Sequence, residues 1–271
     1  MHSLSPFVEI VNSYFPEPHA SLMNGILFGI PLKTTKHFYE DLKTAGLLHM
    51  VVLSGMNIGC IAGITEMFFH KFSKIALTLI TILTVIFFTV LVRSEAPIIR
   101  ATFCTLSTSV AIIAGKRRTA FYTLFLSYCF IAVVWPSWRF SLSTFLSYGA
   151  TLGIILHTAR KDCYSNENKP LSEKISAYLK EESWVSFRAH LFTAPFIYYY
   201  FKQISLVSVL SNVLVSFTIA PLIIFGFLTV TAGMIHQSLG TIPSILCYGL
   251  LQYIIFVVTY VSKIPFAMIK L

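Results

Sequence analysis

Eight long apolar segments dominate the sequence and decide which folds it can adopt. A helix rises about 1.5 Å per residue, so about 20 mainly apolar residues are needed to cross about 30 Å of hydrocarbon. Lipid offers no hydrogen-bond partners for an exposed backbone, and such segments therefore cross as helices. We expect an all-α, polytopic membrane protein with about seven or eight transmembrane helices. The candidate spans are residues 47–69, 75–92, 97–115, 119–135, 140–158, 184–201, 205–233 and 241–262.

The composition leaves no soluble domain of useful size beside these spans. Hydrophobic residues make up 56% of the chain and charged residues 11%, and the mean hydropathy is +0.76. Such values describe a chain whose solvent is mostly lipid. The five cysteines lie far apart, so the sequence predicts neither a zinc site nor a disulfide framework. We expect no metal and no cofactor.

Residues 1–46 differ from the remainder and are expected to form an N-terminal interfacial, amphipathic segment. Residues 20–30 are apolar but too short to span, and residues 34–45 mix charged with apolar side chains. Both stretches are typical of helices that lie at the interface or re-enter it. Residues 47–271 then form the membrane domain, in which residues 160–182 are an exposed loop.

Basic residues in the short loops predict the orientation. The chain has 20 Lys and Arg against 11 Asp and Glu, a formal net charge of +9. Such an excess suits positive-inside topology, anionic lipid or a polyanionic cargo. When loops are counted alternately, the richer side should be cytoplasmic, which places both chain ends on the extracytoplasmic side. The richer side receives Lys71, Lys74, Lys116, Arg117, Arg118, Arg160 and Lys161, and the other chiefly Arg93, Arg139, Lys202 and Lys263.

Polar residues at hydrocarbon depth are the candidate functional residues, because each is costly unless it faces a partner or water. His49, Ser54, Gly55 and Asn57 form the first group, at the head of an apolar span. Their side chains converge only if the helix unwinds near the Ser-Gly pair. Two interpretations stay open: the polar lining of a path, or ordinary hydrogen bonds between close-packed helices.

Two further groups contain arginines and a polar stripe. Arg100 lies about one turn inside its span, where it either snorkels or pairs with Glu95, or acts as a fixed positive charge at a pore mouth. Ser208, Ser211, Asn212 and Ser216 recur at helical spacing and make one polar stripe on an apolar helix. Pro221 predicts a kink or an end of that helix.

The order of several motifs resembles the membrane "competence" domain of ComEC-type DNA-uptake proteins. Residues 45–55, AGLLHMVVLSG, are similar to that family's A-G-L-x-H-L-L-A-I-S-G signature. Arg100-Ala101 and residues 115–117 resemble its R-A and G-R-R, and residues 146–153, LSYGATLG, its L-S-F-A-A-T-L-G. Asn212-Val-Leu and Ala220-Pro-Leu match its later elements. The chain departs at Asn57, where most members carry His.

The resemblance implies an inner-membrane channel that translocates single-stranded DNA during natural transformation. It would stand alone, without the oligonucleotide-binding and metallo-β-lactamase-like domains of larger members, and would not be an enzyme. Its partners would be single-stranded DNA, the lipid bilayer, a separate nuclease, a DNA receptor and a cytosolic motor, with a homodimer as one possible assembly. The residues expected to line the channel or contact DNA are His49, Ser54, Gly55, Asn57, Arg93, Arg100, Ser147 and Asn212.

Two other functions stay open on the residues alone. A secondary transporter or flippase-like carrier for a small or lipid-linked substrate would use the same broken helices and polar faces. An intramembrane hydrolase with Ser54 as nucleophile would need a base within hydrogen-bond reach and an oxyanion hole, and no G-x-S-G context surrounds Ser54.

Overall fold

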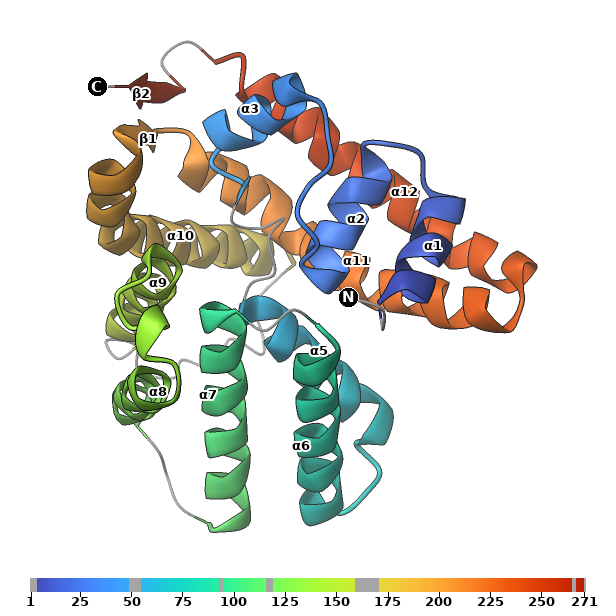
Figure 1. Ribbon diagram of the computed structural model, residues 1–271, viewed down its shortest axis with the longest axis vertical. Coiled ribbons are helices and arrows are strands. Elements are labelled where there is room, and N and C mark those ends of the chain that lie inside the picture. Colours follow the sequence, from blue (N-terminus) through green and yellow to red (C-terminus); the bar gives the residue numbers. More distant parts are fainter. Residues whose placement is uncertain are drawn as a thin grey trace.

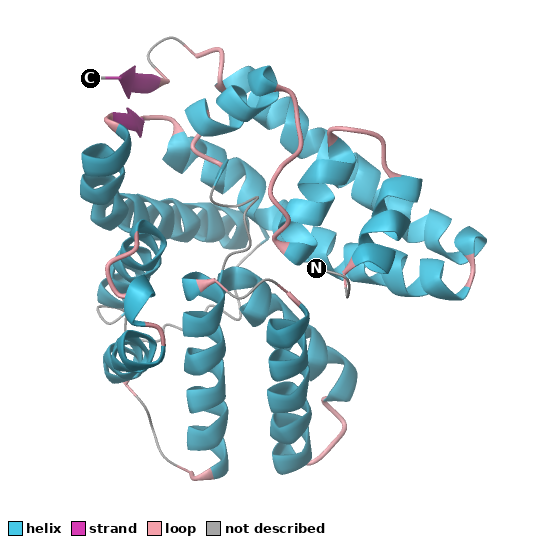
Figure 2. Cartoon of the chain, viewed as in Figure 1, coloured by secondary structure: helices cyan, strands magenta, loops and turns pink. Residues whose placement is uncertain are grey.

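The fold consists of helices and one small pair of strands in the described chain, as the computed structural model shows (Figures 1 and 2). The structure describes residues 4–48, 55–92, 95–115, 119–158, 171–264 and 267–270. The helices are α1 (Ser5–Tyr14), α2 (His19–Phe28), α3 (Lys36–Thr44), α5 (Gly55–Phe69), α6 (Lys74–Leu91), α7 (Ala96–Ile113), α8 (Ala120–Val134), α9 (Leu142–Thr158), α10 (Leu171–Phe201), α11 (Ser208–Ile235) and α12 (Gln237–Val261), with the 3-10 turn η1 (Pro136–Trp138). Strand β1 (Gln203–Ser205) pairs antiparallel with β2 (Met268–Lys270).

The prediction of an all-α polytopic membrane protein is confirmed. Four helices among the described residues, α6, α7, α11 and α12, are long and apolar enough to cross a membrane. Three shorter apolar helices, α5, α8 and most of α9, coincide with further predicted spans. The predicted span 184–201 is the second half of the longer helix α10. Helix α11 continues through Pro221 and does not end there.

The body of the molecule, which we define as α1, α2, α3, α11 and α12, is built around helix α2. Every residue of α2 is buried, and its apolar side chains share one core with Val215, Leu222 and Leu251 of α11 and α12. A helix that lies on a surface keeps one face exposed, and α2 has no exposed face in the described structure. Whether residues 1–46 as a whole act as an interfacial segment stays a prediction.

The polar side chains of α2 are buried, and two of them bond to exposed side chains of other helices. His19 donates from Nε2 to Gln252 Oε1 at 2.9 Å and stacks on Tyr248 of α12, with ring centroids 4.5 Å apart. Asn24 Nδ2 donates to Asn12 Oδ1 at 2.9 Å. A buried polar group costs free energy unless it is hydrogen-bonded, and these contacts offset part of that cost. His19 Nδ1 and Asn24 Oδ1 are buried without a partner in the described structure.

The arm, which we define as α5, α6 and α7, projects from the body (Figure 1). Its core is small and contains Ile58 and Ile61 of α5, Val85 and Phe88 of α6, and Ile98 and Ala101 of α7. Phe227 of α11 packs on Phe88, with ring centroids 5.8 Å apart, and so joins the arm to the body. Much of the arm's apolar surface is exposed, as expected for helices that face lipid.

Helix α10 adjoins the arm through α9. Of the predicted loop 160–182, residues 171–182 are helical because α10 begins at Leu171, and residues 160–170 lie outside the described part. Helices α9 and α10 pack closely along Gly149 and Gly153. A Cβ at Gly153 would lie 2.7 Å from the Arg188 carbonyl oxygen, so glycine permits this contact between the two backbones.

Candidate functional site

The structure describes some of the predicted site residues and not others. The described ones are Gly55, Asn57, Arg100, Ser147 and Asn212. Three of them, Gly55, Arg100 and Ser147, lie in one cluster, whereas Asn57 and Asn212 make other contacts. The predicted residues outside the described part are His49, Ser54 and Arg93.

Arg100 is held inside the molecule by α9. Helix α7 begins at Ala96 with Pro97 in its first turn, which places Arg100 one turn further in. The Arg100 Nε donates to Ser147 Oγ at 2.8 Å, and Cζ lies 5.9 Å from the centroid of the Tyr148 ring. These contacts join α7 to α9 through two residues that lie 47 positions apart in the sequence.

Gly55, the first residue of α5, lies against the Arg100 guanidinium. A Cβ built at Gly55 would lie 2.7 Å from Arg100 Nη2 and 3.1 Å from Ala101 Cβ. No side chain fits there unless the guanidinium moves. The glycine of the Ser-Gly pair therefore has a packing role that its position in the sequence did not reveal.

The cluster extends to α8 through Tyr148. Ser127 Oγ donates to the Leu124 carbonyl at 2.7 Å and lies 2.9 Å from the Tyr148 hydroxyl, so Tyr148 is the donor in the second contact. We call Gly55, Arg100, Ser127, Ser147 and Tyr148 the arginine seam. Sequence reasoning missed Ser127 and Tyr148. The signal for Ser127 was a hydroxyl inside an otherwise apolar span, and Tyr148 follows a predicted site residue.

The arginine seam presents a cation without a carboxylate among its described neighbours. The described contacts of Arg100 do not include the predicted pairing with Glu95. Arg100 instead bonds to Ser147 and packs on Tyr148. A guanidinium stays protonated in proteins and offers five N–H donors in a planar fork that matches phosphate. Ser147 engages Nε, and Cys104 is a further hydrogen-bond neighbour of Arg100. The arrangement can bind a phosphate through the donors that remain.

Asn57 connects the arm to the body. Its Nδ2 donates to the Ile26 carbonyl at 2.6 Å, and the residue is 4% exposed. Ile26 lies in the last turn of α2, where carbonyl groups have no partner within the helix. Asn57 therefore caps the C-terminal end of α2. Its side-chain nitrogen faces this carbonyl and not the arginine seam.

Asn212 belongs to a second polar group, between α10 and α11. One turn before it, the Ser208 hydroxyl lies 3.1 Å from His190 Nδ1. The buried Oδ1 atom of Asn212 and the buried Nε atom of Arg188 have no hydrogen-bond partner in the described structure. Buried polar atoms without partners are uncommon in proteins, which marks this helix pair as a polar region.

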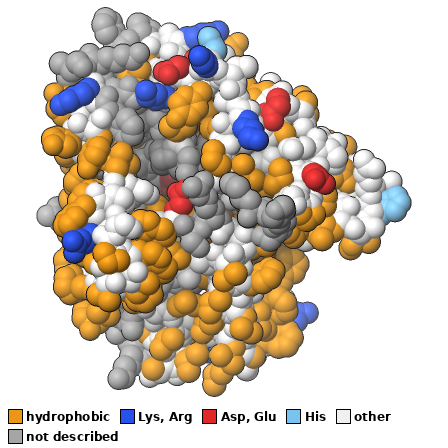
Figure 3. Space-filling view, in the orientation of Figure 1, with side chains coloured by type: hydrophobic (Ala, Val, Ile, Leu, Met, Phe, Trp, Pro, Cys, Tyr) orange, Lys and Arg blue, Asp and Glu red, His pale blue; other side chains and the backbone are white. Residues whose placement is uncertain are grey.

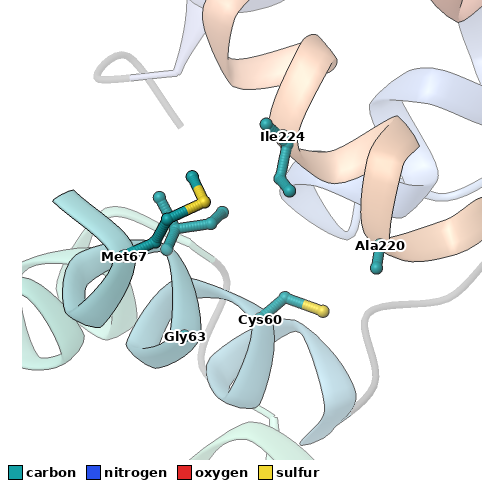
Figure 4. A pocket seen from close by; sticks show the side chains of 6 residues that line it. Cys60, Gly63, Met67, Ala220 and Ile224 are labelled. Atoms are coloured by element: carbon teal, nitrogen blue, oxygen red, sulfur yellow. The ribbon is translucent and has the colours of Figure 1, made fainter.

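The described cavity lies elsewhere and is apolar (Figure 4). It has a volume of about 220 Å³ and opens between α5 and α11. None of the predicted site residues lines it. Its walls are Cys60, Gly63, Ile64, Met67, Ala220 and Ile224.

The described part of the chain contains no cluster of side chains that could bind a metal ion. No group of three or more His, Cys, Asp and Glu side chains lies close enough there to hold an ion. The ion pair between His37 Nδ1 and Asp41 Oδ2, at 2.9 Å, stays within α3 and is largely solvent-exposed on the histidine side.

The fold and the seam define a class: a polytopic α-helical membrane protein that holds an arginine in its interior. A model of the Competence protein family matches residues 26–271, and the chain belongs to that family. The resemblance to the ComEC membrane domain is thereby confirmed. No curated protein and no solved structure matches the chain. Family membership supports a role in DNA uptake.

Proposed function

We propose that the chain forms a passage for single-stranded DNA through the inner membrane during natural transformation. The observation that carries the proposal is the family match over residues 26–271. The arginine seam supports it, because Arg100 sits one turn inside a membrane helix and bonds to a hydroxyl on another helix. A cation placed in this way can attract a polyanion into a low-dielectric interior.

The chemistry of the seam suits a backbone of phosphodiesters. Single-stranded DNA is a polyanion with stackable bases, so its path needs positive charge and polar or aromatic walls. Arg100 supplies the charge, and Tyr148 and Ser147 supply aromatic and hydroxyl surface beside it. The predicted residues His49, Ser54 and Arg93 complete the lining in this proposal, together with Asn212 on the neighbouring helix pair.

The proposal assigns no catalytic step to the chain. A separate nuclease supplies the single strand, a DNA receptor delivers it and a cytosolic motor draws it inward, while both ends of the chain face outward. Assembly as a homodimer is compatible with this scheme.

A competent host that lacks its own ComEC-type protein tests the proposal. Cells that express the chain are given fluorescent DNA, and label that resists added nuclease is measured in the cytoplasm. We expect protected label with the chain and none with an empty vector. Equal protected label in the two strains, with the chain present in the membrane, would contradict the proposal.

The apolar cavity favours a second candidate function, a carrier for a lipid-linked substrate. An acyl chain fits the cavity's lining of apolar side chains between α5 and α11. Ala220→Trp would fill this space. A carrier would then lose transport of its lipid-linked cargo, whereas a DNA passage would keep its uptake of labelled DNA.

A further inference from the structure

One end of the molecule brings together segments from three parts of the sequence (Figure 1). Gln203 pairs with Lys270 across β1 and β2, and the Leu206 amide donates to the Ala267 carbonyl at 2.9 Å. Ser205 Oγ donates to the Thr44 carbonyl at 2.7 Å and so ties the end of α3 to the same place. The C-terminal ends of α10 and α12 therefore lie beside α3 at a common surface.

Lysines lie over tyrosine rings on this surface. Lys202 Nζ is 5.4 Å from the ring centroid of Tyr198 and 5.8 Å from that of Tyr199, and Lys263 Nζ is 5.7 Å from that of Tyr260. The tyrosine side chains also have free surface, since Tyr199 is 72% exposed and Tyr260 59% exposed. Each pair thus offers a cation and an accessible aromatic ring together.

Positive charge is in excess here. Lys36, Lys202 and Lys263 are exposed, and the acidic residues of α3 are Glu40 and Asp41. Asp41 already contacts His37 at 2.9 Å. Figure 3 shows Lys and Arg side chains, with Asp and Glu among them, in the upper part of the molecule, whereas hydrophobic side chains cover most of the lower part.

We propose that this surface is a docking site for single-stranded DNA on its way to the passage. We call it the lysine–tyrosine cap, and it consists of Tyr198, Tyr199, Lys202, Tyr260 and Lys263. Ammonium groups neutralise backbone phosphates, and aromatic rings stack with bases of any sequence. The cap rests on the proposed function, because docking serves uptake only if the chain passes DNA.

Charge and ring geometry favour a nucleic acid over the headgroups of anionic lipids. A headgroup is neutralised by the lysines and leaves the tyrosines only their usual position at headgroup depth, without a partner stacked on the ring faces. An oligonucleotide uses both, since a phosphate meets the ammonium group and the adjoining base meets the ring. Stacking also has a distinct signature, because loss of a tyrosine weakens binding without changing its dependence on salt.

The test uses the full chain in nanodiscs of zwitterionic lipid and a fluorescein-labelled oligo(dT). Tyr199→Ala should weaken binding about tenfold with an unchanged salt slope. Lys202→Asn should lower the slope of log K against log salt by about 0.7. Asparagine is chosen because residue 202 has φ 53°, in the left-handed region that asparagine tolerates. Lys263→Gln is an independent variant at the second pair, with the same expected change in slope.

Matched controls lie away from the cap. Tyr122→Ala on α8 and Lys71→Gln between α5 and α6 remove an exposed tyrosine and an exposed lysine, and both should bind oligo(dT) like the unaltered chain. If the cap variants bind oligo(dT) as tightly as these controls, the proposed docking site is wrong. The proposed DNA passage is not affected by that result. Binding that appears only with anionic lipid vesicles in place of oligo(dT) would identify a headgroup surface and also overturn the cap.

DNA uptake by competent cells separates the two proposals. If the unaltered chain supports uptake but the cap variants bind and take up DNA normally, only the cap is wrong. If the unaltered chain neither binds oligo(dT) nor supports uptake, the passage is wrong and the cap fails with it.

Discussion

The body and the arm achieve their stability in different ways. In the body, 44% of the most apolar 18-residue stretch of α11 is buried, and 39% of that of α12. In the arm, the corresponding shares are 22% for α6 and 33% for α7. The body encloses the fully buried helix α2, whereas the arm has a small core and turns most of its apolar side chains outward. Because outward apolar surface in a membrane protein faces lipid, the arm gains little from burial.

This difference suggests that a few specific contacts decide where the arm lies. Asn57 holds α5 to the end of α2, Phe88 packs on Phe227 of α11, and Arg100 bonds to Ser147 of α9. The positions of the body helices, in contrast, are fixed by many contacts within one shared core. Substitutions in the two regions should therefore differ in kind: those in the body affect folding, and those in the arm affect position and function.

Gly46→Ala should have the largest effect on folding. The Gly46 amide bonds to the Lys43 carbonyl and the Leu47 amide to the Leu42 carbonyl, a Schellman motif that ends α3 with Gly46 at φ 73°. A Cβ would also lie 2.5 Å from Ser208 Cβ. Left-handed strain and overpacking together should cost about 2–5 kcal/mol.

Gly115→Ala is the matched control in the arm. Gly115 ends α7 at φ 63°, but a Cβ there meets no atom within 4 Å, so only the strain of about 1–2 kcal/mol applies. Thermal unfolding in detergent measures both variants. Equal losses of stability would show that the body is no more tightly specified than the arm.

Asn57→Ala should have an intermediate effect at the junction of arm and body. The Ile26 carbonyl would lose its buried donor, which costs about 1–3 kcal/mol. Asn57→His restores an N–H group and should recover part of the loss. Hydrogen exchange should show faster opening at the end of α2 in the alanine variant, while unchanged exchange there would remove Asn57 from the junction.

Ser147→Ala should have a smaller effect, confined to the seam. Arg100 would lose one neutral acceptor, at a cost of about 1 kcal/mol, and its guanidinium would be less well oriented. DNA uptake should fall severalfold while the thermal midpoint stays nearly unchanged. In a double-mutant cycle with Arg100→Lys, additive effects on uptake would mean that the two residues act separately.

The sequence predicted the helical architecture well because the apolar runs are long and their ends carry strong local signals. Predicted spans 75–92 and 97–115 correspond to α6 at 74–91 and α7 at 96–113. Ser73 caps α6 by accepting from the Ala76 amide, and Pro97 opens α7. Such signals depend on neighbours in the chain and are visible in one sequence.

The tertiary contacts could not be predicted from the sequence in the same way. The burial of α2, the bond from Asn57 to Ile26 and the seam from Arg100 to Ser147 join residues that lie 31 or 47 positions apart or belong to different helices. Residue types predicted that Arg100 is costly at its depth, and the resemblance added Gly55 and Ser147 as lining residues. They did not predict that these residues meet, because periodicity fixes a face of a helix but not the helix that it faces.

DNA uptake by the Arg100→Gln variant tests the central claim most directly. Glutamine keeps hydrogen bonding but removes the charge, so protected label should fall at least about tenfold, or ~1.4 kcal/mol. Arg139→Gln is the control, since Arg139 is exposed beside Phe140 and should keep full uptake. Loss in the first variant alone is the expected result. Equal uptake by both variants, each present at normal amounts in the membrane, would contradict the claim that the arginine seam serves DNA passage.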